Sequence, residues 1–204
     1  GDCLNTGCVP SKALISSAKA VQMLKKHTLY GLKNVSYEVD FTLTMERVQD
    51  IIAKVEPHDS VARYSSLGVE CHIGEAMIRS PHEVEVNGQV LTTKNIVVAT
   101  GARPFVPPTP GLEDVQFSHS ENIWDLRKQP KHLAVIGGGP TGSELAQAFR
   151  RLGSEVTIIN IDSRILPRED IDMVQFISDF FEKDGIKLLD ETTIESIEKR
   201  GDSS

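Results

Sequence analysis

A glycine-rich turn in the second half of the chain constrains the fold more than any other feature of the sequence. The apolar run 133–136 leads directly into Gly137, Gly139 and Gly142, spaced as G-x-G-x-x-G, and a helical pattern and a second apolar run follow before residue 161. In such a turn the first glycine permits the tight bend, the second permits close approach of a pyrophosphate, and the third permits packing of helix on strand. We therefore predict dinucleotide binding where that helix begins; a glycine-rich turn without a ligand is the alternative.

The residue that would contact the adenosine ribose is expected at the end of the second strand. Asn160 stands at that point, two residues before Asp162. An amide can hydrogen-bond a ribose hydroxyl, but it does not reject a 2′-phosphate by charge as a carboxylate does. Because Arg164 is also near, the sequence leaves the choice between NAD and NADP open.

Strand and helix patterns alternate around this turn and predict a parallel sheet with crossover helices. The expected strands are 133–136, 155–161 and 186–189, and the expected helices are 141–152 and 170–184, the second ended by Gly185.

The first half of the chain predicts helices followed by a small β unit. The expected elements are a helix over 10–26 begun by Pro10, a second helix capped by Thr44, two short strands at 84–86 and 89–92 joined by Asn87-Gly88, a buried strand at 96–99, and a short helix at 121–126 capped by Ser120. Four prolines within 103–111 predict a stiff connector, and a domain boundary is expected near it.

Composition narrows the classes of function. Apolar residues at 39% and charged residues at 25% exclude a disordered or fibrous chain. The net charge is −7 and no basic run exceeds two residues, so a nucleic-acid partner and an anionic-membrane surface are not expected. Three cysteines are too few for a secreted disulfide scaffold, which predicts a cytoplasmic location. No apolar run is long enough to span a bilayer.

Two cysteines at the start of the chain carry the second chemical signal. Cys3 and Cys8 are separated by four residues, and Cys8 lies just before the helix begun by Pro10. The helix N-terminus, together with Lys12 one turn later, favours a thiolate at Cys8. A thiolate close to a second thiol can cycle between dithiol and disulfide.

Other interpretations of the cysteines stay open. A structural staple and a pair of inert buried thiols are both compatible with the spacing. A zinc site would need about four ligands, and the remaining candidates, Cys71 and His72, are adjacent in sequence and awkward to use together. We predict that Cys71 is a small core residue, that the six histidines are not ligands, and that the chain has no metal site.

The segment 3–12, Cys-Leu-Asn-Thr-Gly-Cys-Val-Pro-Ser-Lys, resembles the redox-active disulfide motif of the class I pyridine nucleotide-disulfide oxidoreductases. Three further segments, 74–76, 99–104 and 137–144, resemble the flavin-contact and nicotinamide-nucleotide motifs of that family, in the same order. The Ser-Lys ending is closer to the dihydrolipoamide dehydrogenase and mercuric reductase branch.

The resemblance implies an α/β fold made of parts of two nucleotide-binding, three-layer domains. Residues 1–110 would form a partial FAD-binding domain with the redox-active disulfide, and 111–204 a Rossmann-like NAD(P)-binding domain, truncated at its C-terminus. Because family chains are much longer, a flavin-binding glycine loop would precede Gly1 and a dimerisation domain would follow Ser204. We expect an internal piece, inactive alone, of a homodimeric enzyme.

The resemblance also implies roles for individual residues. NAD(P)H and FAD would be the cofactors, and a small disulfide, dithiol or mercuric ion the substrate. Cys8 would face the flavin, Cys3 would react with the substrate, and Lys12 and Glu144 would meet beside the flavin within about 4 Å as a partly buried pair. The implied catalytic residues are Cys3, Cys8, Lys12 and Glu144, and the implied cofactor-binding residues are Gly1, Asp2, Lys12, Ala76, Thr100, Gly101, Gly137, Gly139, Gly142, Glu144, Asn160 and Ile194.

Overall fold

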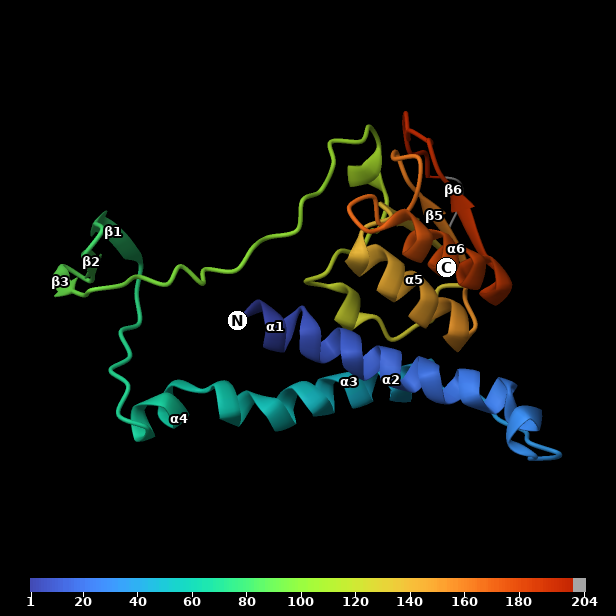
Figure 1. Cartoon of the computed structure of the whole chain (residues 1–204), viewed down its shortest axis with the longest axis horizontal. Coiled ribbons are helices and arrows are strands. Elements are labelled where there is room, and N and C mark those ends of the chain that lie inside the picture. Colours follow the sequence, from blue (N-terminus) through green and yellow to red (C-terminus); the bar gives the residue numbers. More distant parts are fainter. Residues whose placement is uncertain (200–204) are drawn as a thin grey trace.

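Two long helices near the start of the chain pack against each other, as Figure 1 shows for the computed structural model, which describes residues 1–199. Helix α2 covers Cys8–Lys25 and helix α3 covers Phe41–Val55. Helix α2 begins two residues earlier than predicted; Pro10 still fits, because the first N–H groups of a helix have no partner within it. Shorter helices are α1 at Asp2–Asn5 and α4 at Val61–Ser66, with 3-10 turns at His27–Tyr30 and Glu56–Asp59.

The predicted cap of α3 is wrong. Asp40, not Thr44, is the N-cap, and its side chain accepts a hydrogen bond from the backbone N–H of Leu43 at 2.9 Å. Thr44 lies inside the first turn and donates its hydroxyl to the carbonyl of Asp40 at 2.8 Å. The earlier start places Phe41 in the core, where it is 6% exposed.

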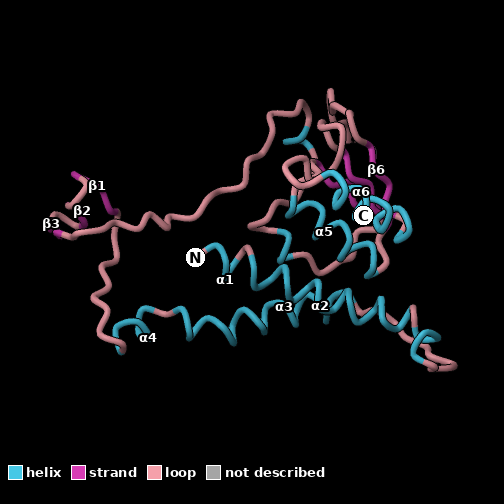
Figure 2. Tube along the Cα trace, in the orientation of Figure 1, coloured by secondary structure: helices cyan, strands magenta, loops and turns pink. Residues whose placement is uncertain are grey.

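Three antiparallel strands form a small sheet in the middle of the chain: β1 (Ala76–Ser80), β2 (Glu83–Val86) and β3 (Gln89–Thr92), in the order β1-β2-β3. Asn87 and Gly88 both have positive φ, as a two-residue hairpin turn requires, so the predicted turn is confirmed. Strand β1 was not anticipated. In Figures 1 and 2 this sheet stands apart from the helices, joined to them by extended loops.

Two predictions for these loops are wrong. The run 96–99 forms no strand, and Val97 is 87% exposed, because none of the strands in the described part of the chain lies beside it to complete a hydrogen-bond ladder. Cys71 is exposed as well, because the extended segment before β1 packs on nothing that would bury it.

The second sheet is parallel, as predicted. Strands β4 (His132–Ile136), β5 (Glu155–Ile159) and β6 (Ile186–Leu189) pair in the order β4-β5-β6, with helices α5 (Pro140–Leu152) and α6 (Ile171–Asp184) as the crossovers. The region before β4 holds 3-10 turns at Leu112–Asp114 and Ile123–Asp125. The helix expected after Ser120 is only the second of these turns, and Asn122, not Ser120, precedes it.

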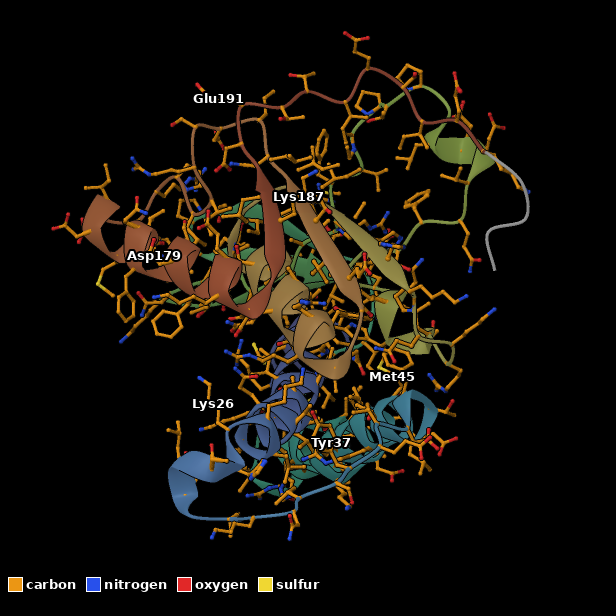
Figure 3. All side chains as sticks on the ribbon, turned by 90° about the vertical axis from the view of Figure 1, so that its right-hand side faces the viewer. Lys26, Tyr37, Met45, Asp179, Lys187 and Glu191 are labelled. Carbon is orange, nitrogen blue, oxygen red and sulfur yellow. The ribbon has the colours of Figure 1, made fainter. Side chains whose placement is uncertain are left out.

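A single apolar cluster joins the helices to the parallel sheet. Leu14 of α2, Met45 of α3, Phe149 of α5 and Ile158 of β5 are all fully buried in it. Figure 3 shows α2 and α3 lying together beneath α5 and the sheet. The domain division at residue 110 stays a prediction, and this core runs across it. Within residues 1–199, no helix combines the length and the apolar character needed to cross a membrane.

Candidate functional site

A tight bend brings the two N-terminal cysteines together. Cys3 lies in α1 and Cys8 is the first residue of α2, with Gly7 as the N-cap between them. A Cβ on Gly7 would stand 3.0 Å from the carbonyl oxygen of Asp2 and 3.3 Å from the Cα of Cys3, so only glycine allows α1 to fold back this closely. Both sulfurs are exposed free thiols, and the disulfide implied by the resemblance is therefore not formed in this structure.

The two thiols interact electrostatically. A hydrogen bond with the Cys8 side chain raises the pKa of the Cys3 thiol above its ordinary value, and loss of hydration and the charge of Cys8 act in the same direction. The proximity of Cys8 therefore disfavours the thiolate form of Cys3. This agrees with a charge favoured at the N-terminus of α2.

Lys12 meets Glu144 across 132 residues of sequence. The ammonium nitrogen of Lys12 lies 2.5 Å from Oε2 of Glu144, so the predicted contact is confirmed. The expected burial is wrong, since the two side chains are 58% and 43% exposed. They are solvated because the cleft beside them is open to water, and an exposed ion pair contributes about 0–1 kcal/mol.

The glycine loop has the backbone geometry that a dinucleotide site needs. Gly137 has φ of +101°, a conformation that side chains rarely adopt, and its N–H donates to the carbonyl of Ile159 at 2.8 Å. A Cβ on Gly139 would meet nothing within 4 Å, which leaves the approach to the loop free. A Cβ on Gly142 would overlap the carbonyl oxygen of Gly137, so this glycine lets α5 pack on β4. These residues fit a pyrophosphate at the beginning of α5.

Asn160 faces into the protein and does not present its amide to a ribose, contrary to the prediction. It is 3% exposed, and its Oδ1 accepts a hydrogen bond from the N–H of Gly138 at 3.2 Å. Its Nδ2 donates to the carbonyls of Asp162 and Arg164 at 3.1 and 2.8 Å and to the side chain of Asp190. Strand β5 ends one residue before it, so the amide lies beneath the glycine loop and supports that loop.

A second contact brings the start of the chain to the predicted flavin-contact segment 99–104. The carboxylate of Asp2 accepts a hydrogen bond from the N–H of Ala102 at 2.7 Å. Gly101 has φ of +72°, and any side chain there would overlap the Asp2 carboxylate. Asp2 and Gly101 were both expected at a cofactor, yet sequence reasoning did not anticipate that they touch.

A cleft of about 390 Å³ lies beside Cys8, Lys12 and Glu144, whereas Cys3 and the glycines of the loop are not among its lining residues. Its walls come from the cysteine turn, the segment after Gly101, the region around Trp124 and the start of α5; the lining residues include Asp2, Cys8, Lys12, Ala102, Trp124, Thr141 and Glu144. Trp124 was missed, although it is the only tryptophan of the chain. Its indole N–H donates to the carbonyls of Ser120 and Thr6 at 2.6 and 3.3 Å and so ties the cleft wall to α1.

Some predicted site residues lie elsewhere. Ala76 is the first residue of β1, in the sheet that Figure 1 shows apart from the cleft. Ile194 lies in the loop after β6, and neither it nor Gly1 nor Thr100 is among the residues that line the cleft. In the described part of the chain, no group of three or more His, Cys, Asp or Glu side chains gathers as a metal site.

Comparison with known proteins gives the same family throughout. The family model described as pyridine nucleotide-disulphide oxidoreductase matches residues 1–204. A mercuric reductase of Bacillus cereus is 35% identical over 99% of this chain and 32% of its own length, and a dihydrolipoyl dehydrogenase of Acholeplasma laidlawii is 33% identical over 97% of this chain and 60% of its own. The Cu(II) complex of the HOCl-induced flavoprotein disulfide reductase RclA from Escherichia coli is similar with a TM-score of 0.76 at 26% identity, over 98% of this chain and 42% of that one.

Proposed function

Because the chain belongs to the pyridine nucleotide-disulphide oxidoreductase family, we propose that it is part of a FAD-dependent disulfide reductase. The proposed activity is NAD(P)H-dependent reduction of a Cys3–Cys8 disulfide, whose two thiols then reduce a small acceptor. The chain spans about a third of the mercuric reductases that it matches, so the proposal concerns the complete protein.

The Lys12–Glu144 contact carries this proposal. Lys12 lies one turn beyond Cys8, and Glu144 is the fifth residue of α5, the helix that follows the glycine loop. The contact joins the helix that begins at Cys8 to the helix that follows the glycine loop, and Cys8 and Thr141 line the same cleft; this supports electron transfer between a cofactor held at the loop and the cysteines. This contact between the cysteine helix and the helix after the glycine loop would not be expected if the two motifs had unrelated functions.

The residues of the cleft fit both cofactors. The loop 137–142 and the first N–H groups of α5 would hold the pyrophosphate of NAD(P)H. Asp2, Lys12 and the segment at Gly101 would contribute to the FAD site. FAD, when bound, supplies the two-electron chemistry between nicotinamide and sulfur.

The two thiols would have different roles, Cys8 on the side of the cleft and Cys3 on the side of the acceptor. Cys8 lies at the N-terminus of α2 and lines the cleft together with Lys12, which supports it as the sulfur that faces the flavin, while the raised pKa of Cys3 supports a protonated thiol there. Cys3 does not line the cleft and is exposed, so an acceptor can reach it. Reduction of the disulfide takes two electrons and two protons and yields two thiols.

We infer that the acceptor is a small disulfide or a thiophilic metal ion. Relatives named for mercuric ion and for dihydrolipoyl groups, and the Cu(II) complex of RclA, support this range. A homodimer and a cytoplasmic location belong to the same proposal, the first from the family resemblance and the second from the low cysteine content.

Thiol counting tests the proposal. The oxidised complete protein, loaded with FAD, is treated anaerobically with NADH or NADPH, and its free thiols are titrated after denaturation. We expect two new thiols in the wild type and in Cys71→Ser, the matched control at an exposed and distant cysteine. We expect none in Cys3→Ser or Cys8→Ser. Bound nicotinamide that produces no new thiols in the wild type would instead indicate a nucleotide-binding module with idle cysteines.

A further inference from the structure

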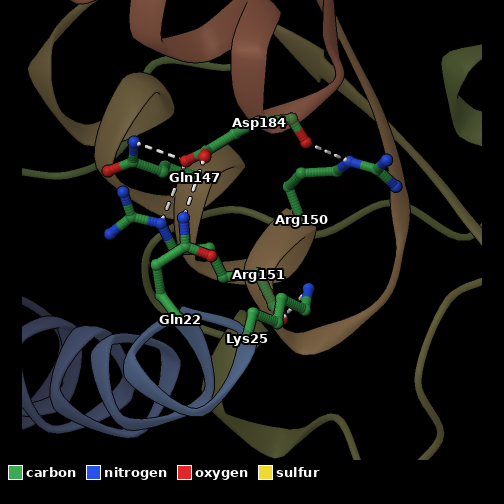
Figure 4. Close-up of polar contacts among 6 residues, drawn as sticks. All are labelled: Gln22, Lys25, Gln147, Arg150, Arg151 and Asp184. Atoms are coloured by element: carbon green, nitrogen blue, oxygen red, sulfur yellow. Dashed lines mark hydrogen bonds and ion pairs between the residues drawn. The ribbon is translucent and has the colours of Figure 1, made fainter. Parts of the chain in front are cut away.

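A polar cluster at the far end of α2 connects three helices through one carboxylate. Asp184 is the last residue of α6, and Figure 4 shows side chains of α2 and α5 converging on it. Gln22 donates to its Oδ1 at 3.2 Å, while Gln147 and Arg151 donate to its Oδ2 at 3.0 Å each. The Asp184 and Arg151 side chains are only 11% and 21% exposed, so these bonds are largely shielded from water.

The backbone at Asp184 is held as firmly as its side chain. Gly185 ends α6 with φ of +82°, and Arg150 Nε donates to the carbonyl of Asp184 at 2.7 Å. A Cβ on Gly185 would stand 2.6 Å from Nη2 of Arg150, so the guanidinium covers this turn closely. Both the backbone and the side chain of Asp184 are therefore bound to α5, and the same side chain also binds Gln22 of α2.

Helices α2 and α5 thus make polar contacts at two places. Lys12 and Glu144 meet near the N-terminus of each helix, and the Asp184 cluster joins them about 10 Å further along α5, at 1.5 Å per residue from Glu144 to Arg151. At the second place Lys25 also donates to the carbonyl of Arg151 at 3.1 Å. Both helices therefore run in the same direction, away from the cleft.

Between these two places α2 and α5 pack through buried apolar side chains such as Leu14 and Phe149, whose contacts are not directional. The facing residues include the small side chains of Ala18 and Ala148, and a hollow of about 290 Å³ lies between the helices there. Apolar packing holds the two helices together, and directional polar contacts add a preference for one axial register.

We propose that Asp184 is a positioning residue of the redox site. By holding Gln22 of α2 against Arg151 of α5 it sets the axial register of the two helices, and this register presents Lys12 and Cys8 to the glycine loop. The proposal rests on the proposed function only for its catalytic consequence; the register itself can be measured without any cofactor.

Carbodiimide coupling measures the register directly, because it forms an amide only between a lysine and a carboxylate in contact. In the complete protein we expect an amide between Lys12 and Glu144, detected as a cross-linked tryptic pair by mass spectrometry. We expect a severalfold lower yield in Asp184→Ala and an intermediate yield in Asp184→Asn. Asp179→Ala is the matched control, because Asp179 is exposed on the same helix and its carboxylate accepts a hydrogen bond from the neighbouring Gln175; its yield should equal that of the wild type.

A second variant covers the case in which Asp184→Ala fails to fold. Gln22→Leu removes only the α2 part of the cluster and leaves the Asp184–Arg151 pair in place, and it should lower the same yield. An unchanged yield in both Gln22→Leu and the folded Asp184 variants would overturn the proposal, because the register would then not depend on this cluster.

Kinetics test the catalytic consequence. For Asp184→Asn we expect a severalfold lower kcat per bound FAD and an unchanged KM for the nicotinamide, because the proposed nucleotide site, the loop 137–142 and the beginning of α5, involves no residue of α2. A wild-type kcat per FAD would show a merely structural residue and overturn the positioning role. Absence of thiol formation in the wild type would refute the proposed function, while the cross-linking result would still decide the register.

Discussion

Replacing two of the loop glycines by alanine should have different effects: Gly142→Ala should lower the stability of the fold, and Gly139→Ala should lower the affinity for the nucleotide. At Gly142 the added methyl would overlap the carbonyl oxygen of Gly137 and lie 3.2 Å from a methyl group of Val135, so helix or loop must shift. Overpacking of this kind costs about 1–3 kcal/mol. With a urea slope of about 1–3 kcal/mol/M, the unfolding midpoint should fall by about 1 M.

At Gly139 the same methyl would meet no atom within 4 Å, and φ is −70°. Loss of glycine as the N-cap costs up to about 1 kcal/mol, and the reduced freedom of the unfolded chain restores about 0.4–1 kcal/mol, so stability should hardly change. The methyl would instead occupy the approach of the pyrophosphate. NAD(P)H affinity should fall at least about tenfold, which is about 1.4 kcal/mol.

Fluorescence of Trp124, the only tryptophan and 3% exposed, reports unfolding in urea, and calorimetry reports nucleotide affinity. An unchanged midpoint for Gly142→Ala would refute the packing argument. Unchanged affinity in Gly139→Ala would refute the role of the open loop, provided that the wild type binds the nucleotide.

Three further changes follow from other parts of the structure. Cys8→Ala should shift the pH dependence of Cys3 alkylation to lower pH, because the neighbour that raises its pKa is gone; a shift to higher pH would contradict this. Glu144→Gln should lower the free energy of unfolding by no more than about 1 kcal/mol, and less in high salt, as urea unfolding at two salt concentrations would show. Phe149→Ala should cost about 3–5 kcal/mol by urea unfolding, because this side chain is fully buried, whereas exposed Phe176→Ala should cost little; equal losses would contradict the core assignment.

The parts of the fold that sequence predicted are those specified locally. The glycine loop and the turn at Asn87-Gly88 depend on backbone conformations that glycine and asparagine adopt readily, and these need no distant partner. The crossover helices have strong apolar periodicity, and the strands between them carry continuous apolar runs. Each of these signals lies within a few residues of the structure that it specifies.

The failures depend on tertiary contacts. Asp40 and Thr44 can both cap a helix; Asp40 does so because Phe41 must reach the ring of Phe149, 5.8 Å away between ring centres, which requires the earlier start. The apolar run 96–99 would form a strand only beside another strand, and a local apolar pattern does not show whether such a neighbour is present. Asn160 was placed correctly at the end of its strand, but only the structure shows its amide facing the loop.

The candidate site shows the same division. The family resemblance led to the Lys12–Glu144 contact, because four ordered motifs define which helices face each other. It gave no indication of how exposed the pair is, and no information on Asp184 of α6, whose partners come from α2 and α5. Exposure and convergence of this kind depend on how whole helices pack.

The wide sequence separation of α2 and α5 also sets an order of events during synthesis. A ribosome releases the cysteine helix long before the helix on which it packs, since Lys12 and Glu144 are separated by 132 residues. An isolated helix of this length is only marginally stable in water, and α3 can cover just one of its sides meanwhile. Until α5 emerges, the nascent chain therefore lacks the helix that packs on the Leu14 side of α2 in the folded structure. Contacts between distant segments also slow folding, so chaperones have a long interval in which to bind here.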